Sequence, residues 1–116
     1  MLLDKEKRDI FITENHYGGG GKSHIEKLLT ETEMGKAARV YARATLQNKG
    51  DEIGYHIHKG ESETYYILKG TALFNDNGTE YEIKAGEATF TPDGSGHSIK
   101  NNGDEPLEFM ALVLYV

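Results

Sequence analysis

The chain has 116 residues, enough for one domain with a single hydrophobic core. Its formal net charge is -6, so its overall field repels nucleic acids and anionic membrane surfaces. The absence of cysteine excludes disulfides, thiolate nucleophiles and zinc–thiolate sites, and it fits a reducing compartment. There is no apolar run long enough to span a bilayer, and the charged start MLLDKEKRDI does not resemble a secretion signal. We therefore expect a cytoplasmic protein without nucleic-acid or membrane partners.

The first third of the chain, residues 1–39, is expected to hold strands and loops. Gly18 to Gly21 followed by Lys22-Ser23 resembles a phosphate-binding loop, but His16 stands where that motif needs its first glycine. We therefore interpret the glycine run as a flexible loop. His16 and His24 do not belong to a recognisable metal-binding pattern, and we interpret both as ordinary surface or loop residues.

Two further segments of this third give weaker signals. Ile25, Leu28 and Leu29 have helical spacing, but the threonines that follow disfavour a helix. The segment from Thr30 to Lys36 is mostly polar and is expected to be a loop.

Residues 40–116 have the pattern of a small all-β protein. Apolar and polar residues alternate from Val40 to Leu46 and from Glu80 to Lys84, as in strands with one buried face. Asn77-Gly78 is a hairpin signal because both residues tolerate a positive φ. Turn signals recur every 8–12 residues or so, which is typical of a β-sandwich or barrel. We expect a small antiparallel β-barrel or jelly roll.

The final segment, Leu107 to Val116, is almost continuously apolar. Such a run suits a strand that is buried on both faces or shared with a partner subunit. It exposes more apolar surface than one short barrel covers, and we therefore expect a homodimer.

The candidate chemistry centres on three histidines and one glutamate. His56 and His58 lie two residues apart on a predicted strand, so both imidazoles leave the same face. Glu63 follows a turn and begins the returning strand, while His97 follows a second turn-rich stretch, Pro92 to Gly96. If the two hairpins meet, these side chains supply three nitrogens and one oxygen to a divalent ion such as Mn, Fe, Co, Ni or Zn.

The alternative is that these histidines are ordinary core or surface residues, as most single histidines in β proteins are. The combination of a His-x-His pair with Glu63 and His97 favours the metal site. An octahedral ion with four protein ligands keeps two positions open. Because a divalent ion and one carboxylate carry net positive charge, we expect a small anionic ligand there.

The spacing of these residues resembles the two cupin motifs. Gly50, His56, His58, Glu63 and Gly70 match the first motif, G-x5-HxH-x3,4-E-x6-G. The second motif, G-x5-P-x-G-x2-H-x3-N, is matched at Gly86, Pro92, Gly94, His97 and Asn101. The resemblance implies a cupin barrel over the whole chain, with the metal held by His56, His58, Glu63 and His97.

Within cupins, the chain looks most like small single-domain proteins described as oxalate-decarboxylase-like. Those decarboxylases have an arginine three residues before the first metal histidine, where this chain has Ile53, and a lid glutamate that has no counterpart here. The resemblance implies a metal-dependent enzyme on a small carboxylate, keto acid or sugar-like substrate, acting as a decarboxylase or lyase, isomerase or dioxygenase. A non-catalytic ligand-binding or sensing module is the alternative, and a structural barrel with a vestigial site is the third hypothesis.

Three further residues are candidates for the pocket. Tyr65 shares strand parity with Glu63, so it is expected to point inward, as a core aromatic or as a catalytic or substrate-binding residue. Arg43 and Gln47 share one strand face and are candidate substrate-binding residues on a pocket wall, although simple exposure to solvent explains them better.

Overall fold

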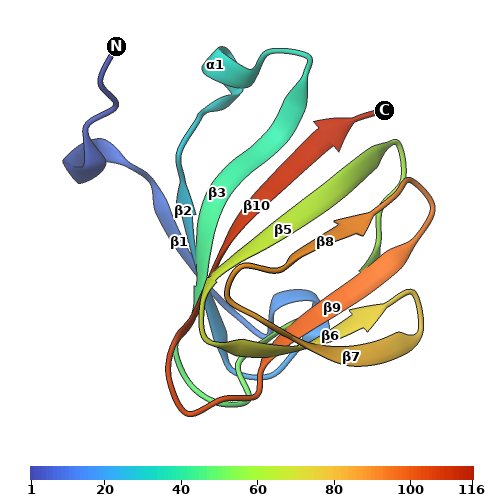
Figure 1. The fold of residues 1–116 in the computed structure, drawn as a ribbon. Helices are drawn as coiled ribbons and strands as arrows, with labels where there is room; N and C mark the ends of the chain where they lie inside the picture. Colours follow the sequence, from blue (N-terminus) through green and yellow to red (C-terminus); the bar gives the residue numbers. More distant parts are fainter.

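The computed structural model describes all 116 residues, and ten strands dominate it (Figure 1). The strands are β1 (Ile10–Glu14), β2 (Lys22–Lys27), β3 (Ala38–Leu46), β4 (Glu52–Ile57), β5 (Glu61–Lys69), β6 (Thr71–Asp76), β7 (Thr79–Lys84), β8 (Ala88–Thr91), β9 (Gly96–Asn101) and β10 (Leu107–Tyr115). One short helix, α1 (Glu31–Met34), and two 3-10 turns, η1 (Lys5–Lys7) and η2 (His16–Gly18), complete the chain. None of the helices is long and apolar enough to cross a membrane.

The strands form two antiparallel sheets. The six-stranded sheet has the order β1-β2-β3-β10-β5-β8, and the four-stranded sheet has the order β4-β9-β6-β7. Figure 1 shows them as separate layers, so this all-β fold is a jelly roll whose sheets do not close into a complete barrel.

The hydrophobic core lies between the two sheets. Its fully buried side chains come from both layers, with Ile67 and Phe109 on the six-stranded sheet facing Phe74 and Ile99 on the four-stranded one. Each such side chain stabilises the fold by roughly 1.5–3 kcal/mol relative to an exposed position. The core therefore fixes the distance between the sheets, and with it the geometry of whatever lies between them.

The alternating segments form the predicted strands. Ala42, Ala44 and Leu46 of β3 are buried on one face. Asn77 and Gly78 have φ values of 50° and 103°, which gives the expected tight hairpin between β6 and β7.

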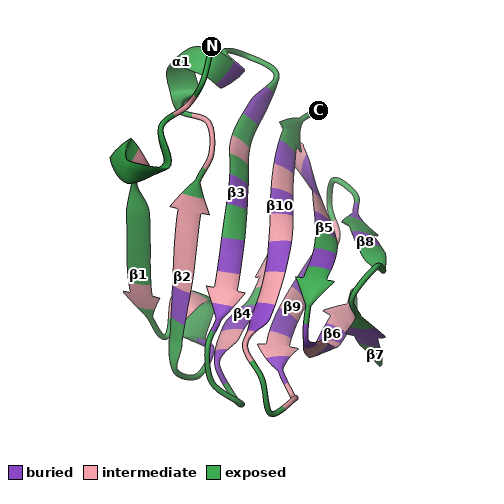
Figure 2. Ribbon diagram, turned by 60° about the vertical axis from the view of Figure 1, so that its left-hand side comes forward, coloured by how far each residue is buried: buried purple, intermediate pink, exposed green.

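The C-terminal strand differs from its prediction. β10 pairs with β3 on one side and β5 on the other, so it lies inside the sheet. Its residues alternate between buried and half-buried, as Figure 2 shows by colour. Phe109 and Val113 face the core, whereas Met110 and Leu112 lie on the opposite face of the sheet. One face of the apolar run is therefore buried in the core, while the other face is half-buried.

The N-terminal third also differs in detail. Ile25 is part of strand β2, and its spacing from Leu28 and Leu29 produces no helix. The only α-helix lies inside the segment predicted as a polar loop, because Glu33 accepts hydrogen bonds from the backbone nitrogen and the hydroxyl of Thr30, at 2.9 and 2.8 Å. These two hydrogen bonds, both donated by Thr30, stabilise a single helical turn.

Candidate metal centre

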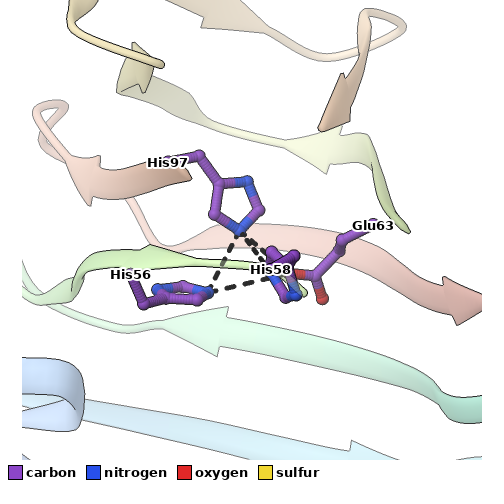
Figure 3. A group of neighbouring side chains, drawn as sticks. All are labelled: His56, His58, Glu63 and His97. Atoms are coloured by element: carbon purple, nitrogen blue, oxygen red, sulfur yellow. Dashed lines mark hydrogen bonds and ion pairs between the residues drawn. The ribbon is translucent and has the colours of Figure 1, made fainter. Parts of the chain in front are cut away.

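The four predicted ligands meet between the two sheets. His56 lies near the end of β4 and His58 directly follows that strand, while His97 lies opposite His56 on the paired strand β9. Glu63 reaches the same point from β5 of the other sheet. Their nearest ligand atoms all lie within 4.8 Å of one another (Figure 3).

The individual distances define a compact cluster. The Nε2 atom of His97 is 3.1 Å from the Nε2 atoms of both His56 and His58. Glu63 Oε1 is 3.0 Å from Nε2 of His58 and of His97, and 3.9 Å from Nε2 of His56. Ligands about 2.1 Å from one ion and at right angles to each other are about 3.0 Å apart. The side chains therefore fit a single divalent ion.

The outer nitrogen of each imidazole is held by a polar partner. Nδ1 of His56 lies 2.7 Å from the Gly54 carbonyl oxygen, and Nδ1 of His58 lies 2.8 Å from Glu61 Oε1. Both partners are acceptors, so each ring donates through Nδ1, and Nε2 is left as the atom that would bind an ion. Nδ1 of His97 is 2.8 Å from the Thr91 hydroxyl. Such partners fix the ring orientation that a metal ligand needs.

Two charged residues, Arg39 and Glu61, fix the position of His58. Arg39 donates two hydrogen bonds to Glu61, Nε to Oε2 and Nη2 to Oε1, both 2.8 Å. The hydrogen bond from Arg39 lowers the pKa of Glu61, which keeps this carboxylate charged against its partial burial. Arg39 and Glu61 therefore form a fixed chain that ends on a candidate metal ligand.

The pKa values of the clustered side chains are shifted in different directions. Burial alone would raise the pKa of Glu63, but the three imidazoles around its carboxylate outweigh burial and hold this pKa far below its ordinary value. The hydrogen bond to Glu63, against burial and with help from Glu61, raises the pKa of His58. Burial lowers the pKa of His97. An ionised carboxylate among three inward-facing Nε2 atoms forms a site in which a cation would take the place of the protons shared with Glu63.

The cluster lies at one end of a cavity of about 310 Å³. This volume is at the lower end of the range for ligand sites, roughly 300–1,000 Å³. Most of the wall is hydrophobic, with Ala42, Ala44 and Ile53 among its members, and Lys27 and Arg39 are its basic residues. Glu63 is the only acidic residue in the wall. The cavity therefore suits a small ligand of negative charge.

The other sequence candidates divide into two groups. Tyr65 lines the cavity and is almost completely buried, with its ring stacked on His97 at a centroid distance of 4.9 Å. Burial raises its pKa well above the ordinary value, so its hydroxyl stays neutral. Arg43 and Gln47 are exposed and lie outside the cavity wall, and Arg43 instead pairs with Glu26. The small apolar residues of β3 face the cavity, which places Arg43 on the opposite face.

Sequence reasoning missed several residues of this region. Glu61 is not among the residues singled out from the sequence, but its spacing from His58 across a turn is a signal for the observed contact. His16 was interpreted as an ordinary loop residue, yet it lines the cavity together with Tyr17. Burial lowers the pKa of His16, and its Nδ1 lies 2.8 Å from the Ser23 hydroxyl. Nothing in the local sequence pairs the loop around residue 17 with a strand that begins at residue 52.

Comparison with known proteins places this geometry in a family. A family model described as a cupin domain matches residues 42–115, well over half of the chain. The chain belongs to the cupin family. Its jelly roll and its cluster of three histidines and one glutamate are consistent with this membership.

The sequence comparison and the structural comparison each find similarity to Thermotoga maritima over most of this cupin's length. An "oxalate-binding protein" is 44% identical over 100 residues, covering 86% of this chain and 82% of the relative. A crystal structure described as a predicted oxalate decarboxylase is 39% identical with a TM-score of 0.93, covering 100% of both chains. A polyketide cyclase from Streptomyces resistomycificus is 18% identical with a TM-score of 0.75 over 98% of this chain and 78% of its own, which shows the shared fold alone.

Proposed function

We propose that this cupin binds one divalent transition-metal ion through His56, His58, Glu63 and His97, and binds a small dicarboxylate of the oxalate type on that ion. The supporting observation is the convergence of three imidazole nitrogens and one carboxylate oxygen, all within 4.8 Å of one another. Mn, Fe, Co, Ni and Zn all suit this donor set. When bound, the ion would act as a Lewis acid and a template for ligand oxygens.

The ligand class is supported by the cavity and by one relative. The cavity is small, its only acidic residue is a proposed metal ligand, and Lys27 and Arg39 contribute positive charge to the wall. The Thermotoga protein that is 44% identical carries oxalate binding in its name. A small dianion would fit inside this cavity and would complement the positive charge of its wall.

Binding without turnover is favoured by the lack of a free carboxyl group in the wall. Glu63 belongs to the metal cluster, and Glu61 is engaged by Arg39 and His58. Tyr65 stays neutral and faces His97. A proton donor for decarboxylation needs a group whose pKa lies near the working pH and whose proton can reach the substrate. Turnover as a metal-dependent enzyme is the second candidate, supported by the similarity to the predicted oxalate decarboxylase.

Calorimetric titration of oxalate into Mn²⁺-loaded and metal-free protein tests the proposal. We expect binding to the loaded protein and at least about tenfold weaker binding to the metal-free protein, equal to about 1.4 kcal/mol. Acetate, a monocarboxylate, serves as the matched ligand control and should bind more weakly than oxalate. Equal affinity with and without metal would contradict the proposal. Release of formate and carbon dioxide from oxalate would instead establish the enzyme.

We also propose that the protein is a homodimer. Because β10 is an inner strand, its outer face is the candidate interface rather than its edge. The exposed aromatic side chains on that face of the six-stranded sheet are Tyr41, Tyr66 and Phe90. An apolar area of this kind commonly marks a protein contact. Light scattering at micromolar concentration should give twice the chain mass, and a monomer mass would contradict the dimer.

A further inference from the structure

The turn before β2 holds a residue in a conformation that its type disfavours. Tyr17 has φ 51° and ψ 36°, in the left-handed region of backbone space. An aromatic residue adopts this region only when its surroundings impose it, and such residues concentrate at functional sites. Four glycines, which adopt a positive φ without strain, directly follow Tyr17. Tyr17 is nevertheless the one aromatic residue of the chain with a positive φ.

Several contacts impose the conformation of this turn. Asn15 Nδ2 donates to the Gly19 carbonyl oxygen at 3.0 Å, and the Asn15 backbone nitrogen donates to the Gly21 carbonyl oxygen at 2.9 Å. Gly19 and Gly54 lie so close that a Cβ on either one would collide with backbone atoms of the other segment. The turn is therefore seated directly on β4, the strand that carries His56.

The Tyr17 ring lies between two imidazoles. It stacks on His56 with a centroid distance of 4.0 Å and an interplanar angle of 13°. His16 stacks on Tyr17 with a centroid distance of 5.0 Å and an angle of 17°. His16 is held in turn by the fully buried Ser23 hydroxyl. Both His16 and Tyr17 line the cavity, and the Tyr17 side chain remains partly exposed at its rim.

From these contacts we infer that Tyr17 is a specificity-determining residue, whose ring walls the cavity beside His56 and restricts the site to very small dicarboxylates. This inference rests on the proposed function. The ring adds a rigid plane that touches a candidate metal ligand. His56 is already oriented by the Gly54 carbonyl oxygen, so the ring is not required to hold the ligand set together. The Tyr17 ring would instead limit the space available to a ligand beside the ion.

Because the Tyr17 backbone is left-handed, one variant can remove the Tyr17 ring without straining the backbone of the turn. Tyr17→Gly removes the ring and places at this position the residue that tolerates a positive φ. Asn77→Gly is the matched control, because Asn77 has φ 50° in the hairpin between β6 and β7, outside the cavity wall. Tyr17→Phe keeps the ring and removes only the hydroxyl. The affinities of Mn²⁺-loaded proteins for oxalate and for succinate, which is two methylenes longer, are measured by calorimetry.

We expect Tyr17→Gly to lower the ratio of oxalate affinity to succinate affinity by at least about tenfold, the lower limit of what steric exclusion in a pocket provides. Mn²⁺ affinity and the midpoint of thermal unfolding should stay close to wild type, and Tyr17→Phe and Asn77→Gly should keep the wild-type ratio. An unchanged ratio in Tyr17→Gly overturns the inference, as does a parallel loss of Mn²⁺ affinity and of both ligands. If wild-type Mn²⁺-loaded protein binds neither dicarboxylate, the proposed function fails first, and this inference fails with it.

Discussion

Glu63 and His97 lie on different sheets, and Glu63 Oε1 is 3.0 Å from His97 Nε2. Both side chains are buried, with exposed fractions of 8% and 0%. An ion bound at this contact would join the six-stranded sheet to the four-stranded sheet. Metal binding is therefore expected to affect the stability of the whole fold as well as the site.

Removal of the metal should lower thermal stability. A ligand at 100 times its dissociation constant stabilises the folded state by about 2.7 kcal/mol. For a chain of this size that corresponds to roughly 10 °C in the unfolding midpoint. Melting curves recorded with Mn²⁺ and with a chelator measure the difference. Glu63→Gln should abolish the difference, and an identical midpoint for wild type in both conditions would contradict the account.

Glu61→Gln tests the outer support of His58. The substitution keeps the shape but removes the charge that Arg39 and His58 share. Loss of such an outer partner typically weakens metal binding about 10–100-fold. Competition with a fluorescent chelator measures the change. Glu80→Gln is the control, since the Glu80 side chain is exposed and makes no hydrogen bond or ion pair. Equal Mn²⁺ affinity in both variants would show that the Arg39–Glu61 chain has no influence on the site.

Metal affinity should rise as the pH increases above about 6.5, the ordinary pKa of an imidazole. The hydrogen bond to Glu63 raises the pKa of His58, so its stabilising effect on the metal-free protein is complete below about pH 6.5 and is lost as the pH rises through the raised pKa. A metal ion must displace that proton. The pKa of Glu63 is lowered and its contribution is lost only in strong acid, so it does not titrate in this range.

Calorimetry in buffers of different ionisation enthalpy checks this linkage. Proton release on Mn²⁺ binding should be greater at about pH 6.5 than at about pH 8.5. Equal release at the two pH values would be incompatible with a raised pKa at His58.

Tyr65→Phe distinguishes a packing role from a chemical one. Tyr65 is buried between His97, Phe74 and Phe109, with ring centroids 4.7–6.1 Å away. We expect Tyr65→Phe to bind Mn²⁺ and oxalate as wild type does. Tyr65→Ala should lose about 3–5 kcal/mol of stability through the cavity that it creates. A selective loss of oxalate binding in Tyr65→Phe, with Mn²⁺ retained, would assign the hydroxyl to the ligand.

The ligand cluster could be predicted from sequence because its information is local. His56 and His58 share a face through the two-residue period of a strand, and glycine-rich turns bring Glu63 and His97 back toward them. Strand alternation likewise predicted the inward position of Tyr65. The hairpin at Asn77-Gly78 was predictable for the same reason, since both residues tolerate the required backbone angles.

The walls of the cavity could not be predicted in this way. Alternation separates the two faces of β3 without saying which face meets the cavity, and the charged Arg43 lies on the face away from it. Arg39 reaches Glu61 across 22 residues, and Tyr17 stacks on a histidine of a different strand. Such contacts join segments that are far apart in the sequence. They depend on the relative positions of those segments in the fold, which the sequence pattern of one segment does not predict.

The most direct test of the metal centre is the metal content of protein reconstituted with Mn²⁺, combined with pulsed electron paramagnetic resonance of the bound ion. We predict one ion per chain, magnetically coupled to three imidazole nitrogens, with one coupling lost in each of His56→Gln, His58→Gln and His97→Gln. Substoichiometric metal after reconstitution, or a bound ion without imidazole coupling, would contradict the account.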